Sequence, residues 1–207
     1  MKVFGSFLVL FFFSSLVLGQ KVVRKILTNP DTRFIQVDTK NCYEVKFHTA
    51  DSQELRVKAS IEGEYAKDLV VRIEEDGQNV FVSTDFLPNF IAPNDKLSAH
   101  KVISIRLDII IPEYGNVTIY GTNTHVTGSG KYRNLKVTLA EGDCILQDVS
   151  KTIEVKTQKG NIHVITQAGM IDARSAYGMV EIADLPKGNF SYSLKSIEGN
   201  IVVSNPK

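Results

Sequence analysis

Apolar residues recur every nine positions through the C-terminal half of the chain. From residue 117 to residue 180, all eight positions at this spacing are apolar, and the positions two residues further on are apolar except at Gly128. Side chains two residues apart lie on the same face of a β-strand. The pattern therefore predicts a short inward-facing strand every nine residues, as in a β-solenoid. The first column is Val117, Val126, Leu135, Cys144, Ile153, Ile162, Ile171 and Val180.

Glycine followed by Asn or Asp marks the predicted corners. Such pairs begin at Gly115, Gly142, Gly160 and Gly199, each just before an inward strand. Both residue types tolerate the left-handed backbone of a tight corner. The separation of the second and third pairs favours a coil of about eighteen residues, with parallel strands stacked about 4.8 Å apart. On this basis Leu135 should lie beside Ile153, and Cys144 beside Ile162.

The first nineteen residues have the features of a secretory signal. Lys2 precedes an apolar run from Phe7 to Leu18, and small residues precede Gln20. We expect residues 1–19 to be a signal peptide and the mature chain to be exported, to the periplasm, the outer membrane or the cell surface. The mature chain is expected not to insert into a membrane. Without Lys2 it carries 23 basic and 23 acidic residues, a balance that argues against a nucleic-acid partner.

Residues 20–112 alternate apolar and polar residues less regularly. The clearest strand runs from Ile103 to Ile111 and is closed by Pro112, and Asp76-Gly77 is a hairpin signal. We predict an all-β protein, a single-stranded parallel β-helix or β-solenoid with about eighteen residues per coil. Residues 20–207 should form one domain, with irregular N-terminal strands over 20–112 and regular coils with a C-terminal cap over 113–207.

These features together resemble a family. A signal sequence, irregular strands, the run from Val102 to Pro112 and coils with Gly-Asn or Gly-Asp corners are similar to the bacterial putative-adhesin β-solenoid families of the DUF4097 and DUF2807 type. The resemblance covers most of the mature chain. It implies a stacked-coil fold at the cell envelope or surface, and it brings no catalytic residues.

The sequence offers few groups for catalysis. Zinc-protease, CxxC, Gly-x-Ser-x-Gly, P-loop and Rossmann patterns are absent, and the corners lack the recurrent Asp of calcium-binding repeats. We therefore expect no catalytic residue, no metal, no cofactor and no enzymatic activity. An eighteen-residue coil would stack Glu154 directly on Asp172, about 5 Å apart, but interleaved cations favour a salt-bridge ladder over a catalytic pair.

Three further side chains carry expectations about packing. The same coil period places His163 beside Glu181 as a surface pair. Cys144 occupies an inward position, whereas Cys42 falls on the face opposite Val45 and so should be an outward thiol. A disulfide between the two cysteines is the less favoured alternative.

The candidate binding residues are Phe86, Phe90, Ile91 and Tyr120. The first three lie in the segment 84–100, which lacks strand alternation and is expected to form a loop. Its aromatic residues either cap an open end of the solenoid or form a contact surface. Tyr120 is one of few aromatic residues on the predicted faces.

The pattern favours an exported, non-enzymatic, adhesin-like β-solenoid that contacts a protein or a glycan at the bacterial envelope. One alternative is a structural subunit of an outer-membrane or periplasmic assembly. Another is a carbohydrate-binding or carbohydrate-active solenoid.

Overall fold

The computed structural model describes residues 20–29, 31–91 and 103–206, so the predicted signal peptide lies outside the described residues. These residues form fifteen strands and no helix, which confirms the all-β class. The strands are β1 (Lys21–Thr28), β2 (Phe34–Asp38), β3 (Cys42–Ala50), β4 (Glu54–Gly63), β5 (Leu69–Asp76), β6 (Asn79–Phe86), β7 (Ile103–Pro112), β8 (Asn116–Asn123), β9 (His125–Glu141), β10 (Cys144–Lys159), β11 (Ile162–Ile165), β12 (Met170–Ser175), β13 (Val180–Ile182), β14 (Ser191–Glu198) and β15 (Ile201–Ser204).

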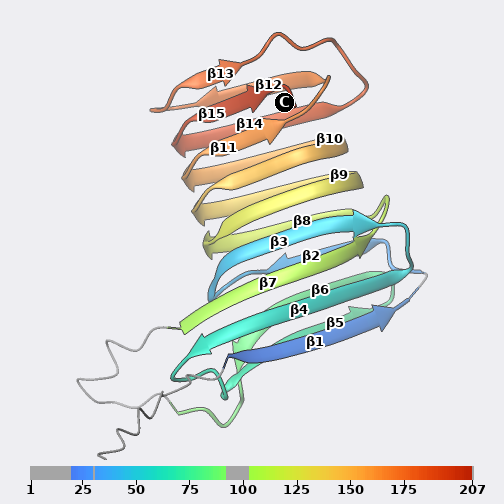
Figure 1. Ribbon diagram of the computed structural model, residues 1–207, viewed down its shortest axis with the longest axis vertical. Coiled ribbons are helices and arrows are strands. Elements are labelled where there is room, and N and C mark those ends of the chain that lie inside the picture. The colour runs from blue at the N-terminus through green and yellow to red at the C-terminus, as the bar shows by residue number, and fades with distance from the viewer. Residues whose placement is uncertain (1–19, 30, 92–102, 207) are drawn as a thin grey trace, which may run out of the picture.

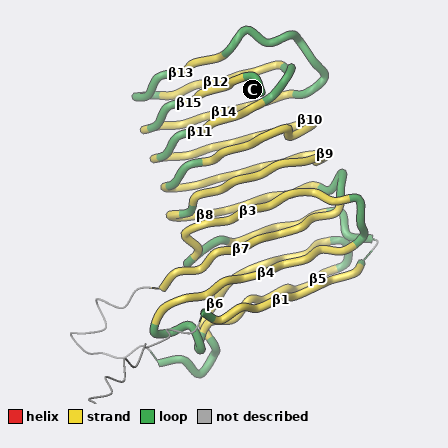
Figure 2. The backbone as a smooth tube through the Cα atoms, viewed as in Figure 1, coloured by secondary structure: helices red, strands yellow, loops and turns green. Residues whose placement is uncertain are grey.

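The strands stack into two ladders that face each other across one core (Figure 1). The first ladder runs β1-β4-β7-β3-β9-β10-β11-β15-β13, and the second runs β5-β6-β2-β8-β9-β10-β14-β12. Strands β9 and β10 are long enough to turn the corner without a break, so each belongs to both ladders (Figure 2). Alternate side chains of both ladders point inward and are buried.

The nine-residue pattern accounts for the register of the central strands. Val117 pairs with Leu135, and Leu135 pairs in turn with Ile153. Cys144 pairs with Ile162. The predicted neighbours are therefore confirmed, and these side chains are buried together. The partners lie eighteen residues apart, as do the Asn134 and Asn116 side chains, whose amide groups hydrogen-bond at 2.6 Å.

The N-terminal strands make the sheet mixed. Strands β2 and β3 pair in parallel with β8 and β9 and so continue the stack. Beyond them, β4 is antiparallel to both β1 and β7, and β5 is antiparallel to β6 through the Gly77 turn. A uniformly parallel solenoid is therefore not confirmed. Alternation of apolar and polar residues fixes which face is buried, but it does not distinguish antiparallel from parallel neighbours.

The last coils are not stacked in the order of the sequence. Strand β14 lies between β10 and β12, and β15 lies between β11 and β13. Strands β12 and β13 are therefore outermost, although they precede β14 and β15 in the sequence. Glu154 consequently pairs with Ser193, and Asp172 lies on the far side of Ser193. The predicted direct stacking of Glu154 on Asp172 is wrong. The predicted pair of His163 and Glu181 is wrong for the same reason, because Val202 lies between them.

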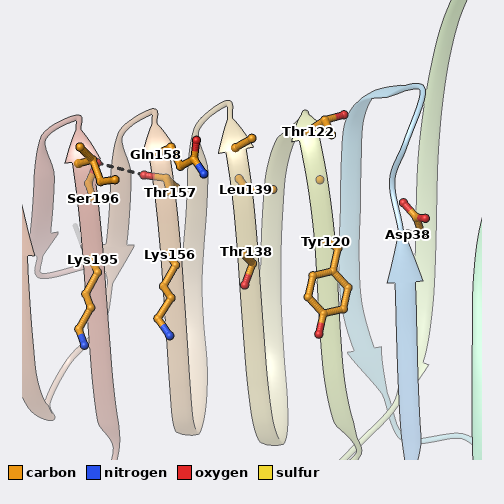
Figure 3. A pocket seen from close by; sticks show the side chains of 13 residues that line it. Asp38, Tyr120, Thr122, Thr138, Leu139, Lys156, Thr157, Gln158, Lys195 and Ser196 are labelled. Carbon is orange, nitrogen blue, oxygen red and sulfur yellow. Dashed lines mark hydrogen bonds between the residues drawn. The ribbon is translucent and has the colours of Figure 1, made fainter.

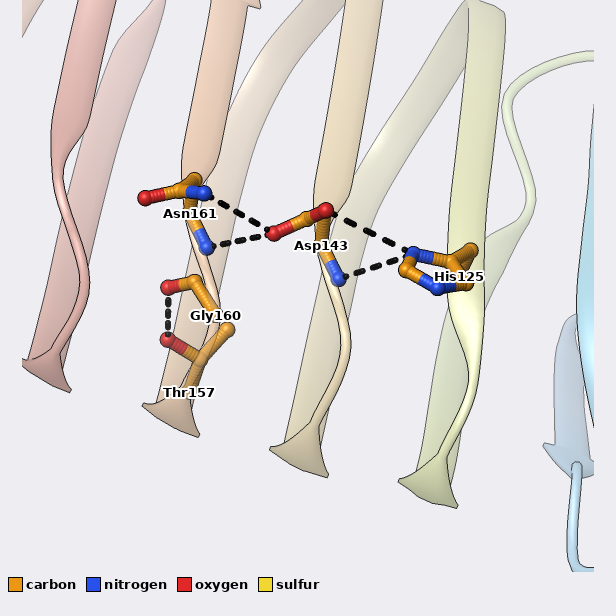
Figure 4. Close-up of polar contacts among 5 residues, drawn as sticks. All are labelled: His125, Asp143, Thr157, Gly160 and Asn161. Carbon is orange, nitrogen blue, oxygen red and sulfur yellow. Dashed lines mark hydrogen bonds and ion pairs between the residues drawn. The ribbon is translucent and has the colours of Figure 1, made fainter.

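Hydrogen bonds at one corner of the stack follow the same order of strands. The backbone N–H of Asn161 donates to Oδ1 of Asp143 at 2.8 Å, and Asp143 in turn lies beside His125 (Figure 4). One level further, the N–H of Asn200 donates to Oδ1 of Asn161 at 2.9 Å. The N–H of Met179 then donates to Oδ1 of Asn200 at 2.9 Å. The polar corner residues thus satisfy backbone donors of the next level.

The glycines of this corner allow the levels to approach closely. Gly160 has a φ of 148°, and a Cβ atom added there would lie 2.0 Å from the carbonyl oxygen of Gly142. A Cβ atom at Gly199 would lie equally close to the carbonyl oxygen of Gly160. Any side chain at these positions would force neighbouring coils apart, which explains why glycine recurs at this corner.

Both cysteines are free and buried. The predicted outward orientation of Cys42 is wrong, since its side chain is only 3% exposed. A register shift between Cys42 and Glu44 inserts Tyr43 as an extra, exposed residue, and this turns Cys42 to the same face as Val45. Burial raises the pKa of each thiol to about 12, so both thiols are protonated at neutral pH.

Candidate functional site

A groove of about 510 Å³ lies on the second ladder, where five neighbouring strands approach one corner. Strands β2, β8, β9, β10 and β14 each contribute one to three residues to it. Its lining consists of Asp38, Tyr120, Gly121, Thr122, Thr138, Leu139, Ala140, Lys156, Thr157, Gln158, Lys195, Ser196 and Ile197. We call it the Tyr120 groove.

The strand register aligns the outward side chains of the Tyr120 groove in one row. Tyr120 pairs with Asp38 on one side and with Thr138 on the other. Thr138 pairs with Lys156, which pairs with Lys195. Figure 3 shows these five side chains side by side on neighbouring strands. Because paired strands lie about 4.8 Å apart, the row spans roughly 19 Å, a length suited to an extended ligand.

The cationic end of the row is partly neutralised. Lys156 forms an ion pair with Glu154, and Lys136 lies 3.9 Å from the same carboxylate. The hydrogen bond from Lys156 is the main cause that lowers the pKa of Glu154. Lys195 forms no direct ion pair with any residue that the structure describes, although its charge also contributes to lowering the pKa of Glu154.

One polar atom in the middle of the row is also unpaired. Oγ1 of Thr138 is buried and has no hydrogen-bond partner within the described part of the chain. Leaving such a group unsatisfied costs about 1–3 kcal/mol.

The carboxylates near the Tyr120 groove are suited to ion pairing. Asp172 accepts a hydrogen bond from Nε of Arg174 at 3.1 Å. Glu154 is ionised more readily than an ordinary glutamate, whereas a general acid needs a raised pKa. Glu154 is therefore not tuned to protonate a leaving group.

The structure separates the four predicted binding residues. Tyr120 is 40% exposed and lies in the Tyr120 groove. Phe86 is the last residue of β6 rather than part of a loop, and it packs against the core. Its ring stacks on that of Phe90 at 4.3 Å, and Tyr65 meets the Phe90 ring edge-on at 5.1 Å. Ile91 is 86% exposed, and residues 92–100 of the predicted loop lie outside the described residues.

Replacing Phe86 and Phe90 with Ser is expected to lower the free energy of unfolding by about 3 kcal/mol, because the stacked rings would be lost from the edge of the core. Denaturation in urea measures the change. Ile91→Ser is the matched control and should change stability by less than about 0.5 kcal/mol. Unchanged stability in the double variant would contradict a capping role and favour a contact surface.

The residues that the sequence did not single out are Lys156, Lys195 and Thr138. Thr138 and Lys156 follow Tyr120 at the eighteen-residue spacing, whereas Lys195 joins the row only because β14 is inserted beside β10. The sequence does not indicate which of these lysines forms a direct ion pair. Lys136 and Lys156 both lie within ion-pair distance of Glu154, whereas Lys195 does not.

The described residues carry neither a candidate metal centre nor a candidate membrane-spanning helix. No three His, Cys, Asp or Glu side chains there are grouped so that they could hold a metal ion. Nor does that part of the chain contain a helix of sufficient length and hydropathy to span a membrane.

No protein-family model matches the sequence, and no curated protein matches it. Solved structures do. A "putative cell adhesion protein" from Clostridium sporogenes is 12% identical, with a TM-score of 0.58 over 91% of this chain and 100% of that chain. A "putative adhesin" from Bacteroides fragilis is 12% identical over 91% and 99% of the two chains, with a TM-score of 0.38. Only the first likeness is close enough to bear on the architecture, and at this identity it shows a shared fold alone.

Proposed function

We propose that this chain is an exported, non-enzymatic, adhesin-like protein that holds a protein of the bacterial envelope in the Tyr120 groove. The observation that carries the proposal is the row of Tyr120, Thr138, Lys156 and Lys195 on adjacent strands. An exposed aromatic ring beside an ammonium group that lacks a direct ion pair is suited to binding and offers no nucleophile with an adjacent base. The signal sequence predicted over residues 1–19 supports export.

The architecture supports the same proposal. We infer that the regular part of the chain is a β-solenoid of about eighteen residues per coil, as in the adhesin-type families that the sequence resembles. The eighteen-residue register from β8 to β11 supports this inference. Stacked coils give a rigid and extended face, and such surfaces suit repeated contacts along a partner.

A carbohydrate is the second candidate for the ligand of the Tyr120 groove. The Tyr120 groove also contains the hydroxyl and amide groups of Thr122, Thr138 and Gln158. This combination of an aromatic face and short polar side chains also suits a sugar ring.

The proposal is tested with fluorescently labelled mature chain, beginning at Gln20, and intact cells of the source bacterium. Combining Tyr120→Ala with Lys195→Ala should weaken binding at least about tenfold, because it removes the central ring and the unpaired cation. The double variant Tyr43→Ala with Lys58→Ala is the control, since both of these side chains are exposed on the first ladder.

Equal loss in both double variants, or no loss in the groove variant, would contradict the proposal. Treating the cells with protease separates the two ligand classes. A protein ligand predicts that binding is lost, whereas a carbohydrate predicts that binding persists and that a glycan array gives a signal which the groove variant lacks.

A further inference from the structure

The outermost coil of the stack, β12 with β13, leaves one end of both ladders open. β12 pairs only with β14, and β13 pairs only with β15, among the residues that the structure describes. Half of the backbone N–H and C=O groups of such edge strands point away from their one neighbour. In Figure 1 these strands form the last level of the stack, and the connection from β13 to β14, whose Leu185 packs against the core, loops over part of this end.

This end is apolar and its core is incomplete. Ile171 and Ala173 are only partly buried, whereas Tyr192 and Leu194, their partners on the next strand inward, are fully buried. Large apolar side chains are exposed nearby: Met170 (56%), Tyr177 (83%), Met179 (64%), Val180 (39%) and Ile182 (47%). Apolar surface gathered at an unpaired strand edge is typical of an interface.

The opposite end of the first ladder is protected. Its edge strand β1 carries Lys21, Arg24 and Lys25 within eight residues. Charged side chains, lysine above all, discourage a second strand from pairing at an edge. The β12–β13 edge also carries three charged residues, Asp172, Arg174 and Glu181, but they are of both signs and so do not repel a second strand as the uniformly basic β1 does.

We propose that a second copy of this chain pairs with the β12–β13 edge, so that the two copies form a two-fold symmetric dimer with continuous ladders. The corner at residues 176–179 reverses the chain between the two strands. Residues equally distant from this corner, such as Arg174 and Glu181, therefore lie at similar heights along their strands. A two-fold axis along the strand direction brings β12 of one copy against the partner's β13, antiparallel and at matching heights.

The sequence of the edge complements itself in this arrangement. Arg174 meets Glu181 of the partner subunit on the outer face, and symmetry forms this pair twice. Ala173 meets Ile182 of the partner subunit on the inner face, which completes the open core. A two-fold axis perpendicular to the ladders would instead place two copies of Glu181 near each other, and like charges on facing strands are unfavourable.

Sedimentation velocity of the mature chain, residues 20–207, tests the dimer. The wild type should dimerise with a Kd of about 100 µM or tighter. Glu181→Arg and Arg174→Glu should each weaken the dimer at least about tenfold, because each places like charges together at two symmetric positions. The combined swap, Arg174→Glu with Glu181→Arg, should restore the affinity to within about threefold of the wild type.

Both side chains are exposed, so circular dichroism and melting temperature should show that the variants fold. A wild type that stays monomeric at about 100 µM would overturn the proposal, as would single variants that dimerise like the wild type. Failure of the combined swap to rescue two folded single variants would overturn the pairing of Arg174 with the partner's Glu181. None of these results depends on the Tyr120 groove.

Discussion

Replacing Gly160 with Ala should lower the free energy of unfolding by about 3 kcal/mol or more. The backbone at Gly160 has a φ of 148°, which is unfavourable for a residue with a Cβ atom. The added atom would also lie 2.0 Å from the carbonyl oxygen of Gly142, a backbone atom that cannot rotate away. The stacked coils would have to separate at this corner, where Gly199 approaches Gly160 from the other side.

Chemical denaturation of Gly160→Ala against Gly77→Ala isolates the effect of stacking. Gly77 also has a positive φ, 59°, but an added Cβ atom there meets nothing within 4 Å. Gly77→Ala should therefore cost only about 1 kcal/mol, the conformational penalty alone. Similar losses in the two variants would contradict close packing of coils at the Gly160 corner.

Replacing Tyr192 with Ala should cost about 3–5 kcal/mol, because it empties a large site in the inserted coil. The Tyr192 ring is fully buried, and its hydroxyl donates a hydrogen bond to the carbonyl oxygen of Val149 at 2.7 Å. The same hydroxyl lies 3.0 Å from Oγ1 of Thr166. The side chain therefore connects β14 to the bend within β10 and to the residue that follows β11.

Two variants separate the parts played by the ring and the hydroxyl of Tyr192. Tyr192→Phe retains the ring and should cost about 1–2 kcal/mol through the lost hydrogen bonds. Tyr43→Ala removes an exposed ring and should change stability by no more than about 0.5 kcal/mol. If Tyr192→Ala were as mild as Tyr43→Ala in urea denaturation, β14 could not be buried between β10 and β12.

The period of the apolar residues predicts the strands and most of their neighbours. It places Leu135 beside Ile153 and Cys144 beside Ile162, and the structure does the same. The reason is physical: the inward apolar side chains of one strand must pack against those of the paired strand to exclude water. The Gly-Asn and Gly-Asp corners are recognisable because they require a backbone that few other residues adopt.

The order of the last coils could not be predicted from this pattern. Tyr192 with Leu194 and Ile171 with Ala173 are both pairs of inward apolar residues, so either pair could lie beside Ile153 and Val155. Both coils also offer a glycine at the corner, Gly178 or Gly199. The inserted order is distinguished by long-range packing, such as the contact of Tyr192 with Val149, which a local repeat does not encode.

The candidate site was predictable to the same extent. Tyr120 stands out because its position is outward and its ring is large, and Thr138 and Lys156 follow it at the eighteen-residue period, but the place of Lys195 depends on the insertion of β14. The orientation of Cys42 depends on one extra residue in β3, and a shift of one residue exchanges the two faces of a strand. Features that follow from local periodicity were predicted, and features that follow from a single irregularity were not.

Disulfide crosslinking between outward positions tests the order of the coils, on which both the Tyr120 groove and the open β12–β13 edge depend. Glu154→Cys with Ser193→Cys places two thiols on paired strands about 5 Å apart, whereas Glu154→Cys with Asp172→Cys places them about 10 Å apart with β14 between them. Cys42 and Cys144 are buried and protonated, so they should not compete. Mild oxidation of the folded protein should link position 154 to position 193 and leave positions 154 and 172 unlinked. Efficient crosslinking of 154 to 172 without that of 154 to 193 would contradict the insertion of β14 between β10 and β12.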